Sequence, residues 1–436
     1  MNALRASDIW IRISSLSRIL GNEPMKNIFH NFNAGNLKEG FKALDGTKAR
    51  GIDNVSKKDY GKNLDSNIEK LLTRLHDGSY VPRPKREILI PKANGKMRPI
   101  AIACLEDKIA EKVAAEILTS IYEPIFVNAS YGFRPNRSCH HAVNRTQEIL
   151  EIKNAFNFVV EIDLANFFNT VNHRILMRLL KKKISNKKFL SLIHRMLTGK
   201  IESSDGETVI PYVGTPQGGV VSPILANIFL HYAIDEWFGE NYGKVARMVR
   251  YADDGIFFFK TQPDAESFLL ELKKRLSEFK LELNDDKTKI VNMSKDSNEV
   301  FDFLGFTFYR GRKRKSRGRL VHVKTSNTKI NKSIDEFTSW IKISRSRFST
   351  KMIIKKVNAK LRGHYNYFGY WCNRNNLYRF YCEVNKVLFK WLNRRSQLKS
   401  LTVLKFENSI TKHLRLPPEI INLKPIGRNP YVKQCA

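Results

Sequence analysis

One stretch of the chain organises the rest: Val249-Arg250-Tyr251-Ala252-Asp253-Asp254-Gly255-Ile256-Phe257-Phe258-Phe259. Two apolar, aromatic-rich runs flank a pair of acids, which predicts two strands joined by a tight turn at Ala-Asp-Asp-Gly, because Asp and Gly accept turn dihedrals. Adjacent carboxylates repel each other unless a cation neutralises them, and hard divalent ions prefer carboxylate oxygens. An ordinary Asp-Gly hairpin is the better explanation of such a motif in isolation. The interpretation therefore depends on the rest of the chain.

The overall charge of the chain is strongly positive. Its 436 residues include 76 Lys+Arg against 42 Asp+Glu, a formal net charge of +34. An excess of this size predicts a polyanionic partner, most simply a nucleic acid bound through its phosphates, with a membrane surface as the weaker alternative. No apolar run approaches the length that spans a bilayer, which excludes an integral membrane protein. The length predicts two or three subdomains.

The five cysteines are scattered and form no Cys-x-x-Cys pair. This pattern argues against a disulfide scaffold and a zinc module, and it fits a reducing interior. No secretory signal is visible, so we expect a cytoplasmic protein of a bacterium. An organelle is the alternative, because the first residues contain Ser and Arg and are mildly amphipathic.

A single acid precedes the paired acids, at the end of another predicted strand. Residues 158–164 form a near-continuous β-rich run, which is typical of a buried strand, and Asp163 lies near its end. A carboxylate at such a position is costly to bury unless it is paired or bound to a metal. Phe167 and Phe168 follow shortly after it.

A glycine-flanked turn lies between the two acidic sites, at Val213-Gly214-Thr215-Pro216-Gln217-Gly218-Gly219. It precedes a predicted helix over 222–230, with Ser222 as the N-cap and Pro223 at the first helical position. Backbone N–H groups beside glycines and at a helix N-terminus suit a phosphate or a base-paired nucleotide. An ordinary helix start explains the proline but not the Gln-Gly-Gly.

The N-terminal third predicts helices followed by a basic hairpin. Helical spacing is seen over 67–75, ending at Asp77-Gly78, and again where apolar residues repeat every four positions over 109–121. Strands at 88–90 and 100–102 flank a turn that carries Lys92, Lys96 and Arg98. A solvated loop and a phosphate-binding loop explain these cations equally well.

The C-terminal third changes in composition. Residues 268–279 predict an amphipathic helix, and residues 301–308 predict a strand. The glycine-punctuated basic run 310–319 predicts a flexible linker or loop that touches phosphates. From about residue 325 the pattern is helical, with basic and aromatic residues interleaved in a way that supports contacts to bases or to a sugar-phosphate backbone. Packing in a small helical bundle accounts for about half of these aromatics.

Three acids stand out from this survey: Asp163 on a strand, and Asp253 with Asp254 on a hairpin. Two-metal phosphoryl transfer needs strand-borne and turn-borne carboxylates that converge on ions about 4 Å apart. Lys92 and Arg98 would supply positive charge to a triphosphate. Each feature is weak alone, but their order and spacing together indicate this chemistry.

Taken in order, these motifs resemble those of the reverse transcriptases encoded by group II introns, which carry a maturase domain. The resemblance extends from about residue 35 to 425. It rests on Gly51-Ile52-Asp53, Ile90-Pro91-Lys92 through Arg98-Pro99, Tyr131-Gly132-Phe133-Arg134-Pro135, Asp163 with Phe167-Phe168, Gly214 through Gly219, Tyr251 through Asp254, Phe303 through Phe306, Leu361-Arg362-Gly363-His364-Tyr365 and Trp391 through Gln397.

The resemblance implies a role for each site residue. Asp163, Asp253 and Asp254 would hold two Mg²⁺ ions, with Mn²⁺ as a substitute and the Leu164 carbonyl as a further ligand. Phe168 would exclude a ribose 2′-hydroxyl, with Phe167 as the alternative if the register differs. Triphosphate contacts would come from Arg86, Lys92 and Arg98, a contact to the incoming nucleotide or the template from Gln217, and nucleic-acid contacts from Arg134, Arg312, Arg314, Arg362, Tyr365, Arg394 and Arg395.

The same resemblance implies an α+β right-hand polymerase, with fingers and palm of antiparallel sheet and helices followed by an α-helical thumb. The expected parts are a helical extension (1–80), fingers and palm (81–310), a basic linker (311–324), a thumb/maturase domain (325–400) and a tail (401–436). Expected partners are an RNA template, a DNA or RNA primer, deoxynucleoside triphosphates and a group II intron RNA, without a membrane.

Two departures and two alternatives qualify the resemblance. Asn169 stands where family members often have Asp, and no cysteine pairs of an HNH endonuclease are present, so we expect no endonuclease activity. One alternative is a splicing-only maturase whose polymerase site is a relic, which the intact acids and Gln217 disfavour. The other is a host-adopted reverse transcriptase in phage defence, CRISPR adaptation or hypermutation.

Overall fold

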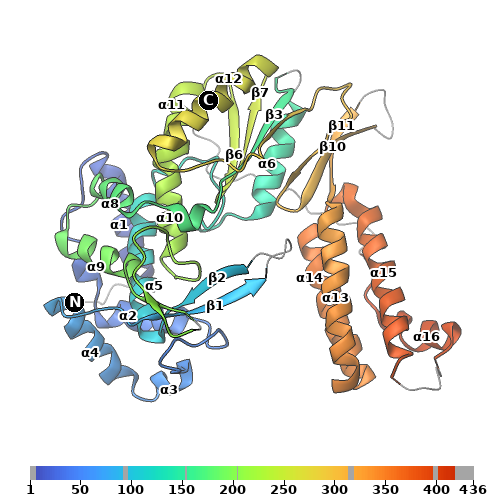
Figure 1. Cartoon of the computed structure of the whole chain (residues 1–436), viewed down its shortest axis with the longest axis horizontal. Coiled ribbons are helices and arrows are strands. Elements are labelled where there is room, and N and C mark those ends of the chain that lie inside the picture. The colour runs from blue at the N-terminus through green and yellow to red at the C-terminus, as the bar shows by residue number, and fades with distance from the viewer. Residues whose placement is uncertain are drawn as a thin grey trace. The chain divides into compact units, whose positions relative to one another are not determined.

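The computed structural model describes residues 6–91, 97–152, 155–203, 205–312, 319–395 and 401–417. Helices and largely antiparallel sheets alternate up to β11, and the C-terminal region is helical, as the predicted α+β class requires (Figure 1). The described residues divide into two compact units. Unit 1 draws on Met1–Ala142, Val160–Phe257 and Pro263–Lys289, and unit 2 on Val143–Val159, Phe258–Gln262 and Ile290–Ala436.

Three sheets are present among the described residues. The first has the order β2-β1-β4-β5, the second β6-β7-β3-β8 and the third β11-β10-β9. Their strands are β1 (Lys85–Pro91), β2 (Met97–Ile102), β3 (Phe158–Asp163), β4 (Ile201–Glu202), β5 (Thr208–Val209), β6 (Arg247–Tyr251), β7 (Asp254–Phe259), β8 (Lys289–Asn292), β9 (Phe301–Phe303), β10 (Phe306–Arg312) and β11 (Arg319–Thr325).

Helices make up most of the rest of unit 1. The predicted helix over 67–75 is confirmed and ends as expected, because Gly78 follows it in the left-handed conformation at φ 87°. The helices are α1 (Ala6–Leu20), α2 (Ala34–Ala43), α3 (Lys57–Gly61), α4 (Leu64–Asp77), α5 (Leu105–Tyr122), α7 (Phe167–Thr170), α8 (His173–Lys181), α9 (Lys187–Leu197), α10 (Ser222–Leu230), the π-helical segment η2 (His231–Asp235), α11 (Glu236–Tyr242) and α12 (Gln262–Glu278), with η1 (Phe29–Asn31) and, across the unit boundary, α6 (Cys139–Glu151).

The core of unit 1 lies around β7 and the helices that cover it. β7 is buried on both faces, which explains its unbroken aromatic run. Alternation of apolar and polar residues is expected only of strands with one solvent-exposed face. Phe257 packs on Phe268 of α12 with ring centroids 4.7 Å apart. The predicted helix over 109–121 is confirmed as α5, and its four-residue repeat is fully buried. The catalytic candidate Asp254 therefore begins a strand that is packed into the core.

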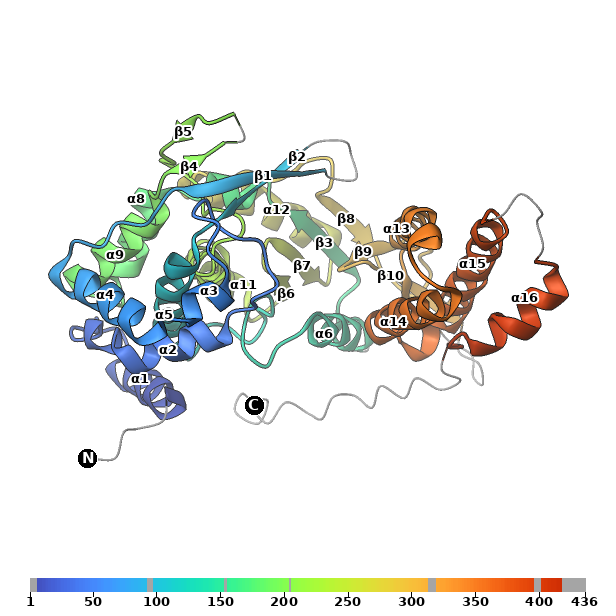
Figure 2. The same cartoon turned by 90° about the horizontal axis from the view of Figure 1, so that it is seen from below.

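Unit 2 contains the β9-β10-β11 sheet and a helical region. Figures 1 and 2 show α13 (Asn327–Arg347), α14 (Thr350–Phe368) and α15 (Arg374–Leu392) running side by side, with α16 (Val403–Ser409) beyond α15. The short helix η3 (Trp371–Asn373) joins sheet and helices: buried Asn373 accepts from Thr325 N at 2.8 Å and donates to Thr325 Oγ1 at 2.7 Å. A further short helix, η4 (Thr411–His413), follows α16.

Several predicted boundaries are wrong, each for a local reason. Residues 301–308 form two strands rather than one, because Leu304 and Gly305 turn the chain at φ 53° and 81°. The predicted linker over 311–324 belongs in part to β10 and β11, whose antiparallel register pairs Arg312 with Arg319; residues 313–318 lie outside the described residues. The first part of the predicted tail over 401–436 contains α16. None of the helices in the described ranges is long and apolar enough to cross a membrane.

Candidate active site

The paired acids lie where β6 turns into β7. The predicted hairpin is confirmed, but its turn is shorter than expected: Ala252 adopts the left-handed conformation at φ 56°, and Asp254 and Gly255 already belong to β7. Gly255 serves close packing rather than the turn, because a Cβ there would lie 2.9 Å from Ile162 Cγ1 of β3. The glycine thus lets β7 approach the strand that carries Asp163.

The charge of Asp163 acts on both Asp253 and Asp254, and that of Asp253 acts on Asp254. Burial, reinforced by the charges of Asp253 and Asp163, raises the pKa of Asp254 to about 7. Burial also raises the pKa of Asp253, and Asp163 adds to this, whereas Arg98 and Lys287 act in the opposite direction. A group of mutually repelling, half-desolvated carboxylates is an environment that a bound cation relieves.

Asp163 has a cationic partner that the sequence analysis missed. Lys287 Nζ lies 3.0 Å from both Asp163 carboxylate oxygens, and Asn284 Nδ2 donates to Oδ2 at 3.1 Å. Two residues further on, Lys289 pairs with Glu161 at 3.3 Å. The available signal was the matching period of two, since Lys287-x-Lys289 repeats the spacing of Glu161-x-Asp163.

The donor set fits divalent metal ions, although the side chains are not gathered around one. Among the described residues, no three His, Cys, Asp or Glu side chains are arranged to hold a metal ion. The carboxylates of Asp163, Asp253 and Asp254 are nevertheless the hard oxygen ligands that Mg²⁺ prefers. The ammonium group of Lys287 stands where a cation would approach Asp163, which supports the chemical fit of this position for positive charge.

The two phenylalanines after Asp163 differ in exposure. Phe167 is 1% exposed and packs against Phe229, so it belongs to the core. Phe168 is only partly buried, and its carbonyl accepts from Thr215 N at 2.7 Å. Of the two candidates for a sugar-contacting residue, the structure therefore leaves Phe168 available.

The Gln-Gly-Gly turn is held against the β1–β2 hairpin. The Gln217 carbonyl accepts from Ala101 N at 2.8 Å, and Gly218 adopts φ 104°. Glu111 of α5 accepts from Val220 N at 2.6 Å and forms a buried ion pair with Lys85 at 3.0 Å. Because the Gln217 carbonyl and the Val220 amide are both hydrogen-bonded, the turn presents the Gln217 side chain from a preorganised backbone.

The predicted helix after this turn is confirmed as α10, but its cap is not. Val221 is the N-cap and Ser222 is the first helical residue. The Ser222 hydroxyl donates to the Pro216 carbonyl at 2.8 Å, so it closes the turn instead of capping the helix.

The predicted basic hairpin is confirmed as β1 and β2. Their antiparallel register sets Arg86 opposite Ile102 and Ile90 opposite Arg98, so both arginines lie on one face of the hairpin. Both are exposed, and Arg86 Nη2 donates to the Arg50 carbonyl at 2.9 Å. Lys92 lies outside the described residues.

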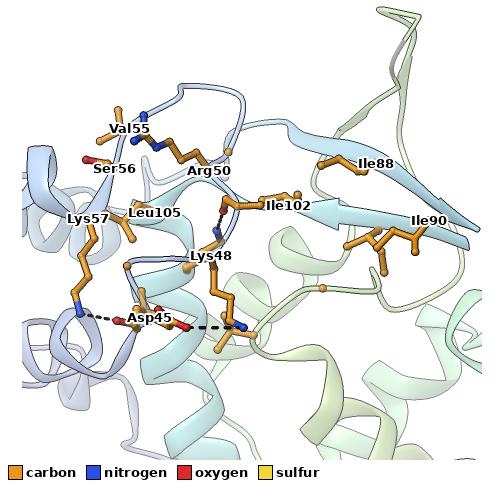
Figure 3. Close-up of a pocket in the computed structure, with 18 residues that line it drawn as sticks. Asp45, Lys48, Arg50, Val55, Ser56, Lys57, Ile88, Ile90, Ile102 and Leu105 are labelled. Carbon is orange, nitrogen blue, oxygen red and sulfur yellow. Dashed lines mark hydrogen bonds and ion pairs between the residues drawn. The ribbon is translucent and has the colours of Figure 1, made fainter. Parts of the chain in front are cut away.

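A pocket of about 420 Å³ opens on the same hairpin face. Figure 3 shows its two sides, with Ile88, Ile90 and Ile102 on the hairpin and Lys48 and Arg50 on the loop that faces it. Gly218 and Val220 of the Gln-Gly-Gly turn also line it. Apolar walls with cationic residues at the side suit a flat, phosphate-bearing ring such as a nucleotide.

Arg134 is not available to nucleic acid, contrary to the prediction. Its side chain is 2% exposed, pairs with Glu123 at 2.8 Å and donates to the carbonyls of Val127 and Ser130 at 2.6 and 2.9 Å. A guanidinium whose donors are used inside the protein holds the 123–134 loop in shape.

The predicted C-terminal contacts divide in the same way. Tyr365 is buried, and its hydroxyl donates to the Arg415 carbonyl at 3.1 Å, so it is a core residue and not a nucleic-acid contact.

The predicted arginine contacts differ from one another. Arg395 is exposed, but it donates to the Arg345 carbonyl and to Thr350 Oγ1, at 2.7 and 2.8 Å, where α13 ends and α14 begins. Arg362 and Arg394 are exposed, with Arg394 over the Trp391 ring. Arg314 and the side chain of Arg312 lie outside the described part of the chain.

Comparison with known proteins finds two family matches, one in each part of the chain. Residues 90–308 match the family model of reverse transcriptase (RNA-dependent DNA polymerase), and residues 330–406 match the group II intron, maturase-specific domain. Protein YkfC of Escherichia coli (strain K12) is 33% identical over 311 residues, which cover 63% of this chain and 80% of that protein.

Two further relatives are similar over shorter shares of their length. The group II intron-encoded protein LtrA of Lactococcus lactis subsp. cremoris is 30% identical over 401 residues, covering 72% of this chain and 65% of LtrA. An uncharacterized 91 kDa protein in a cob intron of Schizosaccharomyces pombe is 38% identical over 170 residues, covering 39% of this chain and 20% of that protein.

Proposed function

The chain belongs to the reverse transcriptases that carry a group II intron maturase domain, and from this premise we propose that it copies RNA into DNA by two-metal phosphoryl transfer. The observation that supports the chemistry is the electrostatic environment of Asp254: burial, together with the charges of Asp253 and Asp163, raises its pKa to about 7. Such a shift in a preorganised site is typical of catalytic carboxylates.

In this proposal the three aspartates, with the Leu164 carbonyl, would hold two Mg²⁺ ions. Bound there, the ions would lower the pKa of the primer 3′-hydroxyl and neutralise charge on the leaving pyrophosphate. The bond between the 3′-oxygen and the α-phosphorus forms as the bond between the α- and β-phosphates breaks. Asp163 ends β3, Asp254 begins β7 and Phe168 lies in α7, so strands and a helix position these residues around that reaction.

The nucleotide would lie between the hairpin and the Gln-Gly-Gly turn. Arg98 acts electrostatically on Asp253, which supports a position from which it also reaches the triphosphate, together with Arg86 and Lys92. We propose that Phe168 closes the space beside the sugar 2′-carbon and so selects deoxynucleotides. The pocket lined by Gly218 would take the base of the template opposite the incoming nucleotide, and Gln217 directly precedes Gly218 in the chain.

A second part of the proposed function is to bind the parent intron RNA and to aid its splicing. It is supported by the maturase match over 330–406 and by the +34 charge, which favours long phosphate contacts. The bacterial cytoplasm, or an organelle, is the proposed location. Template, primer and triphosphate are the remaining proposed partners.

Primer extension on an RNA template tests the polymerase proposal. Wild type should extend the primer with deoxynucleotides and Mg²⁺, whereas Asp253→Asn, which keeps the side-chain shape, should lose activity by several orders of magnitude. Splicing of a flanking intron RNA should survive that substitution, because it needs binding and not polymerisation. If wild type and Asp253→Asn were equally inactive while splicing persisted, the splicing-only alternative would replace the proposal.

A further inference from the structure

The residue before Tyr251 is an arginine whose side chain is enclosed by the protein. Arg250 is 1% exposed, and its Nε and Nη2 donate to the two Asp235 oxygens at 2.6 and 2.5 Å. Nη1 donates to the Ala252 carbonyl at 2.8 Å and to Asn227 Oδ1 at 3.3 Å, and Nη2 also donates to Ser130 Oγ at 2.9 Å. Every N–H of the guanidinium is therefore matched by an acceptor, with no donor left for a ligand.

One of these acceptors is part of the catalytic turn itself. The Ala252 carbonyl belongs to the residue held at φ 56°, and Asp253 follows it directly. A non-glycine residue in the left-handed region persists only when its surroundings impose that conformation. The bond from Arg250 Nη1 is such a constraint, because it reaches across the turn from the strand that precedes it.

The partners of Arg250 come from a helix with irregular winding. Asn227 lies in α10 and Asp235 ends the π-helical segment η2, eight residues later. In a regular α-helix eight residues turn through about 800°, about 80° beyond two full turns, so the two side chains would point in different directions. The wider π winding reduces this rotation and lets both face Arg250. The π segment thus places the Asp235 carboxylate where Arg250 can donate to it.

A third element, the loop at 129–132, also contacts the turn. The loop at 129–132 pairs with β6 through Arg250 N to Ala129 O and Tyr131 N to Arg250 O, both at 2.8 Å. A Cβ on Gly132 would lie 2.4 Å from Ala252 N, and the Gly132 carbonyl accepts from Asn227 Nδ2 at 2.7 Å. The loop is therefore in direct contact with the turn and is fixed by the same asparagine that binds Arg250.

We propose that Arg250 is a positioning residue which, with Asp235, Asn227 and Ser130, fixes the left-handed Ala252 and thereby aims Asp253 into the active site. The inference rests on the proposed function, because it assigns a purpose to the position of Asp253. It adds a specific claim: the geometry of the acids is set by a buried polar cluster behind the hairpin and not by the hairpin sequence alone. Arg250 touches neither substrate nor metal in this proposal.

The test replaces the buried ion pair by apolar residues of similar size. Arg250→Met combined with Asp235→Leu removes both charges together, so neither is left buried and unpaired, a change that folded proteins often tolerate. In primer extension, kcat should fall about 100-fold, as expected for a misplacement near 1 Å, while KM for the deoxynucleotide stays within about twofold. Arg250→Lys keeps a charge opposite Asp235 but cannot reach the Ala252 carbonyl as well. It should therefore also lower kcat without changing KM for the deoxynucleotide, with a smaller loss of Tm than the double variant.

A second readout needs neither metal nor turnover. Hydrogen exchange of the peptide spanning 247–259 should be faster in both variants than in wild type, in the absence of divalent ions. The matched control is Arg74→Met with Glu106→Leu, a partly buried ion pair of unit 1 at 2.6 Å that lies outside this cluster. It should lower Tm but leave kcat and the exchange of 247–259 unchanged.

The outcomes separate the two proposals. If the folded Arg250 variants keep wild-type kcat and slow exchange at 247–259, the positioning role is wrong even though the polymerase stands. If the control lowers kcat as strongly as the Arg250 variants, the effect is general destabilisation and the inference also fails. If wild type itself extends no primer, the proposed function fails, while the exchange experiment still tests the cluster.

Discussion

The ammonium nitrogen of Lys287 lies 3.0 Å from each of the two carboxylate oxygens of Asp163. An ion that binds Asp163 must compete with this group. The Lys287 side chain is 61% exposed, and exposed ion pairs are worth about 0–1 kcal/mol. Lys287→Met should therefore tighten Mg²⁺ binding to the metal-free protein by at most about fivefold, measured by titration calorimetry.

Lys273→Met is the matched control for this experiment. Lys273 forms an exposed ion pair with Asp285 at 2.9 Å, and that acid is not among the site residues. Its loss should leave Mg²⁺ affinity unchanged. Weaker binding in Lys287→Met would mean that the lysine supports ion binding and does not compete with it.

The stability of the metal-free protein should fall as pH rises toward neutrality. The pKa of Asp254 is raised to about 7 in the folded state, against about 3.9 when unfolded. Between these values the folded state keeps a proton that the unfolded state has lost, so this group reduces stability progressively with increasing pH. Below about pH 4 the Asp254 carboxyl does not change the free energy of unfolding, and above about pH 7 its destabilising effect is complete.

Asp254→Asn tests this directly, because it removes the titrating charge. In urea denaturation with a chelator, the variant should be more stable than wild type at pH 8 and no more stable at pH 4. Mg²⁺ at pH 8 should stabilise wild type more than the variant, since binding requires the deprotonated carboxylate. Parallel stability profiles for the two proteins from pH 4 to 8 would contradict the assignment.

Selection against ribonucleotides should depend on Phe168 and not on Phe167. Phe168→Val opens space beside the sugar and should reduce discrimination by roughly tenfold or more, measured as the ratio of kcat/KM for deoxy- and ribonucleotides. Phe167→Leu alters a residue that is 1% exposed, so it should lower Tm and leave the ratio unchanged. The reverse result would assign the sugar contact to Phe167.

The Gln-Gly-Gly turn should tolerate no side chain at Gly218. Alanine there must adopt φ 104° and place its Cβ 2.9 Å from the Ala101 carbonyl, so the turn would move away from β2. We expect a several-fold rise in KM for the deoxynucleotide in primer extension. Gly206→Ala has the same kind of backbone penalty at φ 82° but meets no atom within 4 Å, so it should change stability only.

Substitutions of Arg134 and of Arg362 should affect the salt dependence of RNA binding differently. Arg134 is buried and bound inside the protein, so Arg134→Met should lower Tm and leave the salt dependence of RNA binding unchanged. Arg362 is exposed, and if it contacts a phosphate, Arg362→Ala should reduce the slope of log K against log salt by about 0.7 to 0.9. A reduced slope in Arg134→Met would contradict the burial argument.

Local patterns in the sequence predicted much of this architecture because they depend on neighbouring residues. The period of four in α5, the aromatic run of β7 and the apolar run at 88–90 all appear in the structure as helix and strands. Predicted strand boundaries were wrong where the backbone changed direction at one or two residues, as at Leu304 and Gly305. The order of motifs was sufficient to indicate the family, because order and spacing are properties of the chain itself.

Which side chains are free was decided only by tertiary structure. Arg134 and Tyr365 belong to basic or aromatic motifs, yet both are buried, and Phe167 and Phe168 look alike in sequence but differ in exposure. The paired acids at Asp253 and Asp254 were recognisable from the sequence alone. Their geometry depends on groups far along the chain, including Lys287 beside Asp163 and the buried Arg250 behind the turn, because burial and electrostatic contact arise only when distant segments pack together.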